Sequence, residues 1–208
     1  MRKVVFIFCL MILLAGAAYA QGVAEDKMAA QISKLNKAGI DTIMVYGPNG
    51  GGVRVYQDNS PCYVYHNERY VAWIHKNHNY ITLIDECYEY EVLKDKLKPV
   101  ADLLAGHLSE IVKQDIRAPA YKVIRNGKEE LGRWSTSDDM SFKLTFYYKG
   151  HPYIKSFESY YLRDQYGPGI DSTDRHLNIY YDQNQKSYIK PAYDLMNKVL
   201  PTLKFEKK

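Results

Sequence analysis

An alternation of apolar and polar residues over positions 141–148 constrains the fold of this chain more than any other feature. Apolar side chains stand at every second position from Phe142 to Tyr148, which is the period of a β-strand with one buried face. Lys149-Gly150 follows as a turn signal, and residues 153–161 predict the returning strand. Because so short a turn can join only antiparallel neighbours, the pattern predicts an antiparallel sheet.

Similar patterns extend this prediction along the chain. The other predicted strands are residues 42–46, 53–56, 62–66, 70–75, 80–85, 121–125 and 177–181. Residues 70–75 carry apolar groups on both faces, which predicts a sheet covered on both sides. Residues 121–125 run into Asn126-Gly127, a pair suited to a tight reverse turn because both residues accept positive φ.

Three segments carry the periodicity of helices: residues 27–38, 97–112 and 191–200. The second is the clearest, since its apolar residues recur at steps of three and four and form one stripe. These are Leu97, Val100, Leu104, Leu108 and Ile111. Strands joined by short turns and interrupted by a few helices indicate the α+β class, with a mostly antiparallel sheet and three main helices.

The N-terminus has the layout of a secretory signal peptide. Arg2 and Lys3 precede an unbroken apolar run over residues 4–15, and Ala18-Tyr19-Ala20 supplies the small residues of a cleavage site. We therefore expect residues 1–20 to be removed and residues 21–208 to form a single α+β domain that is secreted or periplasmic. No transmembrane segment is expected after cleavage, although an uncleaved anchor is the alternative for residues 4–20.

Cysteine usage agrees with export. The expected mature chain contains two cysteines, Cys62 and Cys87, and two thiols in an oxidising compartment usually pair. We expect a structural disulfide between them. Two free buried thiols and a reactive thiol are the alternatives, and the spacing between the two cysteines is far from the C-x-x-C pattern of redox sites.

The charge balance argues against nucleic acid as a partner. The chain has 28 Lys and Arg against 24 Asp and Glu, and removal of Arg2 and Lys3 leaves 26 against 24. A surface that follows a phosphate backbone needs a larger basic excess.

A metal site or a cofactor site is not expected either. His66, Glu68, His75 and His78 fall close together and could hold a metal, but two of them belong to a turn and a strand end, where polar residues are ordinary. The chain also lacks the G-x-S-x-G, H-E-x-x-H and S-x-x-K patterns of known catalytic sites. We assign no catalytic residues, no metal ligands and no cofactor.

A long connection near the C-terminus is the candidate binding site. Connections of this length in compact domains are often functional, and this one is rich in polar side chains. The candidate binding residues are Tyr166, Asp171, Asp174, Arg175 and His176.

Tyrosine is the other unusual feature, with 20 in the chain against 6 Phe and 2 Trp. Tyrosine suits both half-buried strands and wet binding surfaces. The sequence therefore favours a non-catalytic protein that binds an unknown protein, peptide or glycan through an aromatic-rich sheet face or the 166–176 loop. A small secreted hydrolase with an Asp, His and Tyr site, and a structural protein of the cell envelope, are the alternatives.

Overall fold

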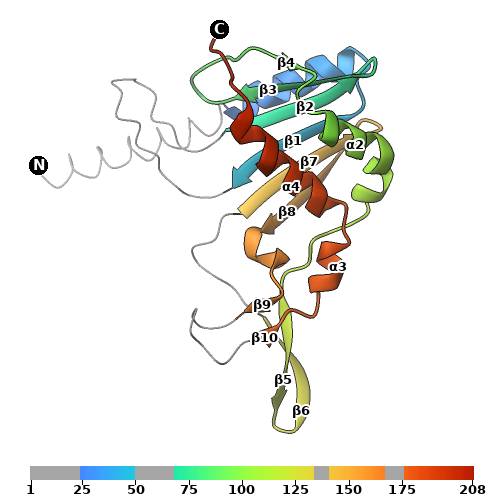
Figure 1. Cartoon of the computed structure of the whole chain (residues 1–208), viewed down its shortest axis with the longest axis vertical. Coiled ribbons are helices and arrows are strands. Elements are labelled where there is room, and N and C mark those ends of the chain that lie inside the picture. The colour runs from blue at the N-terminus through green and yellow to red at the C-terminus, as the bar shows by residue number, and fades with distance from the viewer. Residues whose placement is uncertain (1–23, 50–67, 134–140, 167–175) are drawn as a thin grey trace, which may run out of the picture.

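The computed structural model describes residues 24–49, 68–133, 141–166 and 176–208. Its main sheet has the strand order β4-β3-β2-β1-β7-β8, and every neighbouring pair is antiparallel. The strands are β1 (Ile43–Asn49), β2 (Arg69–His75), β3 (His78–Ile84), β4 (Leu93–Lys94), β7 (Ser141–Tyr148) and β8 (His151–Glu158). With the helices packed on this sheet, the chain has the predicted α+β architecture (Figure 1).

Strand β7 confirms the pattern from which the fold was predicted. Phe142, Leu144 and Phe146 are buried, and they alternate with side chains of the opposite face. In β2, by contrast, Val71, Ala72 and Trp73 are all buried although neighbouring side chains point to opposite faces. The sheet is therefore covered on both sides at β2, as predicted.

Helices supply the two covers. Helix α2 (Lys98–Ile111) and helix α4 (Ile189–Val199) lie over one face, and a helix over residues 24–37 lies over the other (Figure 1). The buried positions of α2 are Val100, Leu104, Leu108 and Ile111, which is the predicted stripe. The three predicted helices are thus present, with ends shifted by one to three residues.

Aromatic rings fill the layer between the sheet and α4. The ring of Tyr193 on α4 lies 4.7 Å from that of Phe142 and 5.4 Å from that of Phe157, between ring centroids. Tyr46 stacks on Phe142 at 6.1 Å, and its hydroxyl donates to Asn197 Oδ1 at 2.6 Å. The aromatic-rich face of the sheet is therefore part of the core, where tyrosine contributes apolar area and a satisfied hydroxyl.

Burial of Tyr46 makes the stability of the fold sensitive to alkaline pH. Desolvation, together with the nearby Tyr193 and Tyr70, raises the pKa of the Tyr46 hydroxyl well above its usual 10.0. The unfolded chain ionises at about pH 10 while the folded protein keeps this proton, so stability is complete below pH 10 and falls above it. We expect the free energy of unfolding to fall by up to about 1.4 kcal/mol per pH unit above pH 10 from this group.

Urea unfolding at rising pH measures this fall. The variant Tyr46→Phe should lose less stability between pH 9 and pH 11 than the unsubstituted protein, although it starts lower because it lacks the hydrogen bond to Asn197. If the free energies of unfolding of the two proteins fall in parallel between pH 9 and pH 11, the buried Tyr46 hydroxyl is not the cause of the fall.

Two predicted strand segments are wrong. Residues 177–181 do not form a strand: only His176–Leu177 (β10) is extended, and helix α3 (Tyr181–Gln185) follows. The side chain of Asn178 causes the change, since its Oδ1 accepts from the Tyr180 N–H at 3.0 Å and bends the backbone. Residues 159–161 belong to a 3-10 turn, η1 (Ser159–Leu162), rather than to the end of β8.

Several predictions fall on parts of the chain outside the described residues. These are the signal peptide over residues 1–20, the strands over 53–56 and 62–66, and Cys62. The Cys62–Cys87 bridge therefore stays a prediction. Among the helices that the structure does describe, none is long and apolar enough to cross a membrane.

Candidate functional site

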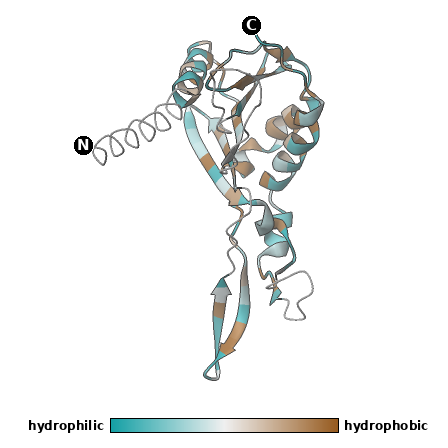
Figure 2. Cartoon of the chain, turned by 90° about the vertical axis from the view of Figure 1, so that its left-hand side faces the viewer, coloured by the Kyte–Doolittle hydropathy of each residue, from teal (hydrophilic) through white to brown (hydrophobic). Residues whose placement is uncertain are grey.

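A two-stranded hairpin projects from one end of the molecule, beyond the main sheet and its helices (Figures 1 and 2). It consists of β5 (Ala120–Arg125) and β6 (Lys128–Arg133), which pair antiparallel. The turn residues Asn126 and Gly127 have φ of 51° and 74°, as a tight two-residue turn requires. The turn predicted at this pair is confirmed.

Apolar side chains are exposed at this end to an unusual extent. Ile124 and Leu131 on the hairpin are 77% and 57% exposed, and Leu177 on the adjacent β10 is 66% exposed. With Ile179, they make up four of the six exposed large apolar side chains in the described part of the chain; Val92 and Ile154 are the other two. Such clustering is typical of a contact surface, whereas isolated exposed apolar residues are ordinary.

The two apolar side chains of the hairpin share one face. Leu131 pairs with Lys122, and Ile124 pairs with Glu129, so these four side chains project from the same side of the ladder. Lys122 Nζ lies 2.9 Å from Glu129 Oε1. This face, which we call the Ile124–Leu131 face, thus combines an apolar centre with charged groups of both signs.

Tyr121, on the opposite face, fixes the base of the hairpin. Its ring lies across Gly132 on β6, where an added Cβ would stand 2.4 Å from the ring. The ring also stacks on His176 of β10, with centroids 4.1 Å apart and planes inclined by 13°. Only glycine leaves room for this arrangement, which holds the hairpin against β10.

Two of the predicted binding residues meet at the same place. Strand β9 (Gln165–Tyr166) pairs antiparallel with β10, and Tyr166 stands opposite His176 in the register. Asp171, Asp174 and Arg175 lie outside the described residues. The predicted loop therefore begins and ends beside the base of the hairpin, and the role of its remaining residues stays a prediction.

The side chain of Asn184 on α3 anchors the segment that leads into the hairpin. It is fully buried; its Oδ1 accepts from Arg117 N, and its Nδ2 donates to Arg117 O and to Tyr161 O, each at 2.9 Å. Further along, Ile179 N donates to Ala120 O at 3.0 Å. These bonds fix the direction in which β5 leaves the body.

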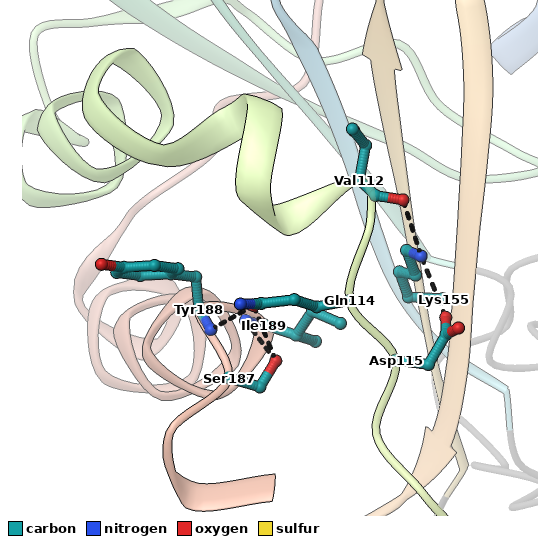
Figure 3. Close-up of polar contacts among 7 residues, drawn as sticks. All are labelled: Val112, Gln114, Asp115, Lys155, Ser187, Tyr188 and Ile189. Atoms are coloured by element: carbon teal, nitrogen blue, oxygen red, sulfur yellow. Dashed lines mark hydrogen bonds and ion pairs between the residues drawn. The ribbon is translucent and has the colours of Figure 1, made fainter. Parts of the chain in front are cut away.

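A second anchor lies just after α2 and is drawn in Figure 3. The buried Lys155 on β8 donates from Nζ to Val112 O at 3.1 Å and pairs with Asp115 Oδ1 at 2.9 Å. On the other side, Gln114 Oε1 accepts from Tyr188 N at 2.8 Å and from Ser187 Oγ at 3.1 Å. The segment between α2 and the hairpin is thus held by the sheet and by the two residues that precede α4.

A groove of about 450 Å³ lies elsewhere, between the helix over residues 24–37 and the sheet edge at β3. Trp73, Tyr88 and Tyr90 contribute aromatic lining. One of its polar groups serves the fold, because Lys27 Nζ donates to the carbonyls of Asp85 and Glu86. This groove has the size of a small-molecule pocket.

Among the residues that the structure describes, no three His, Cys, Asp or Glu side chains come together in a group that could hold a metal ion. His78 pairs instead with a carboxylate, with 2.9 Å between its Nδ1 and Asp95 Oδ2. Desolvation alone would raise the pKa of Asp95, but its hydrogen bonds with His78 and the Asn79 N–H outweigh it and hold that pKa below the usual value.

Sequence reasoning missed the exposed face of the hairpin and the polar anchors at its base. One signal was available, since Ile124 and Leu131 flank the Asn126-Gly127 turn among charged residues. The Asn184 anchor joins segments far apart in the sequence and left no local pattern. Comparison of the chain with protein-family models, with curated proteins and with solved structures gives no match.

Proposed function

We propose that this chain is a non-catalytic interaction protein that contacts a protein partner through the end formed by β5, β6 and β10. The observation that carries the proposal is the clustering of exposed apolar side chains on the projecting hairpin, with Ile124 77% and Leu131 57% exposed. The burial of apolar area stabilises protein complexes, and the charged groups around it restrict the choice of partner.

The same proposal places the protein outside the cytoplasm, in the periplasm or the medium, with residues 1–20 removed and Cys62 bonded to Cys87. The signal-like N-terminus and the two cysteines of the expected mature chain support it. The intact mass of the protein recovered from an exporting cell tests both points. Retention of residues 1–20, or the mass of the reduced form, would refute the corresponding point.

Substitution of the apolar residues on the hairpin tests the contact surface. The variant Ile124→Ser/Leu131→Ser should lose the proteins that the immobilised chain retains from an envelope extract. Each truncated anchor in an interface core costs about 1–3 kcal/mol, so two together should weaken binding by about thirtyfold or more. Quantitative mass spectrometry of the bound fraction is the measurement.

A matched control uses the two exposed apolar residues that lie elsewhere, Val92 and Ile154, which are 44% and 57% exposed. The variant Val92→Ser/Ile154→Ser also removes two exposed apolar side chains and should keep the bound proteins. Equal retention by both double variants would reject the hairpin as the contact surface.

A further inference from the structure

We propose that two copies of this chain pair through the outer edges of their β6 strands, which joins the two hairpins into one four-stranded antiparallel sheet. The inference rests on the proposed function, since it names the partner of the same surface. It follows from the backbone register of the hairpin, the sequence of β6 and the position of the hairpin on the molecule.

The register decides which backbone groups of β6 face outward. In a hairpin with a two-residue turn, Arg125 and Lys128 form the hydrogen-bonded pair beside the turn, and hydrogen-bonded pairs then alternate with non-hydrogen-bonded ones. The backbone N–H and C=O groups of Glu129, Leu131 and Arg133 therefore point away from β5. The same rule directs Ala120 outward on β5, and Ala120 O indeed accepts from Ile179 N.

The outer edge of β6 is suited to a further strand. Within the described part of the chain, β6 pairs only with β5, and β5 is the strand that contacts the segment after β10. A two-stranded hairpin is marginally stable in water, whereas a sheet of three or more strands is stable. Addition of a strand at β6 would satisfy its outward backbone groups.

The sequence of β6 matches itself in one antiparallel register. With Leu131 opposite Leu131 of the second copy, Glu129 stands opposite Arg133 twice, so each dimer gains two pairs of opposite charge. All of these side chains lie on the Ile124–Leu131 face, because a two-fold axis perpendicular to the sheet keeps each face on its own side. The exposed leucines then cover each other.

Other registers lack this complementarity. A pair centred on Glu129 or on Arg133 would place like charges opposite each other, which destabilises a ladder. Charges on edge strands commonly prevent association. Here the order of charges along β6 favours the register centred on Leu131 over those centred on Glu129 or Arg133.

As far as the described residues show, the place of the hairpin in the molecule leaves room for a second copy. The hairpin projects lengthwise beyond the helices and the main sheet in both views (Figures 1 and 2). Two hairpins can thus lie side by side with the main sheets at opposite ends of the dimer.

A cysteine placed on the two-fold axis tests the register. Opposite Cα atoms of a hydrogen-bonded antiparallel pair lie about 5.5 Å apart, within the range that a disulfide spans. Leu131→Cys should give a covalent dimer under mild oxidation on a non-reducing gel. Lys122→Cys is the matched control, because it projects from the same face on the distant strand and should remain largely monomeric.

Charge reversal tests the same register independently by sedimentation velocity. The unsubstituted protein should form dimers as its concentration rises. Glu129→Arg and Arg133→Glu should each weaken dimerisation at least about tenfold. The double variant Glu129→Arg/Arg133→Glu should recover it, and so should an equimolar mixture of the two single variants, in which opposite charges meet again. Glu130→Arg, on the other face of β6, should have little effect.

The outcomes separate this inference from the proposed function. A protein that stays monomeric at all concentrations, or a cross-link no stronger at Leu131→Cys than at Lys122→Cys, overturns the dimer. The proposed function survives that result if Ile124→Ser/Leu131→Ser still abolishes capture of another protein. Recovery of dimers on mixing the single variants supports the β6 pairing, because a general loss of folding could not produce it.

Discussion

Phe146→Ala should lower the free energy of unfolding by about 4 kcal/mol, the largest effect that we expect of a single substitution here. Phe146 is fully buried on β7, where it stands between Met44 on β1 and Tyr153 on β8. Truncation to alanine removes the apolar area of the ring and leaves a cavity that rigid sheet neighbours cannot fill. Urea unfolding near pH 7, followed by circular dichroism, measures the change.

Ile154→Ala is the control for this measurement. Ile154 lies on the neighbouring strand β8 but is 57% exposed, so its truncation should change stability by less than about 0.5 kcal/mol. A cost below about 1 kcal/mol for Phe146→Ala would show that this part of the sheet is not the packed core described above.

Asn184→Ala should cost about 3 kcal/mol and should loosen the hairpin more than the rest of the molecule. The substitution removes three hydrogen bonds to the backbone of Arg117 and Tyr161, at a site with no exposed surface. A buried backbone group left without a partner costs about 1–3 kcal/mol, and partial entry of water keeps the total near the lower end. Hydrogen exchange should therefore accelerate first in β5, which begins three residues after Arg117.

Gln183→Ala provides the matched control, since Gln183 is the exposed neighbour of Asn184 on α3. It should leave both stability and exchange in β5 nearly unchanged. Asn184→Asp separates shape from hydrogen bonding, because it keeps the size of the side chain but loses the amide donor. If all three variants behave alike, Asn184 does not anchor the hairpin.

The parts of the fold that were predictable are those with a local period. The alternation through Phe142 and Phe146 identified β7, and the stripe through Val100 and Leu108 identified α2, because a buried face repeats within a few residues. The same reasoning predicted a strand over residues 177–181, and that prediction was wrong. Leu177 and Ile179 also alternate, but both are exposed. The segment between them and the start of α3 is too short to form a strand ladder.

The candidate site was predictable only in part, because it depends on contacts between distant segments. Asn126-Gly127 revealed its turn, and the long polar connection marked Tyr166 and His176. Nothing in the local sequence indicated that the ring of Tyr121 would stack on His176, or that Asn184 would bond to Arg117. Such contacts follow from tertiary packing, which single-sequence periodicity does not contain.

The central position of β1 has a consequence for how the polypeptide reaches this state. Val45 on β1 pairs with Val71 on one side and with Thr145 on the other, so one neighbour is close in the sequence and the other is one hundred residues away. The β2–β3 and β7–β8 hairpins can form early, but their union requires closure of a long loop, which is slow. During synthesis, a chain that has emerged only as far as α2 therefore exposes unpaired backbone groups along one edge of β1. The risk of aggregation through this edge depends on how quickly the C-terminal half is made.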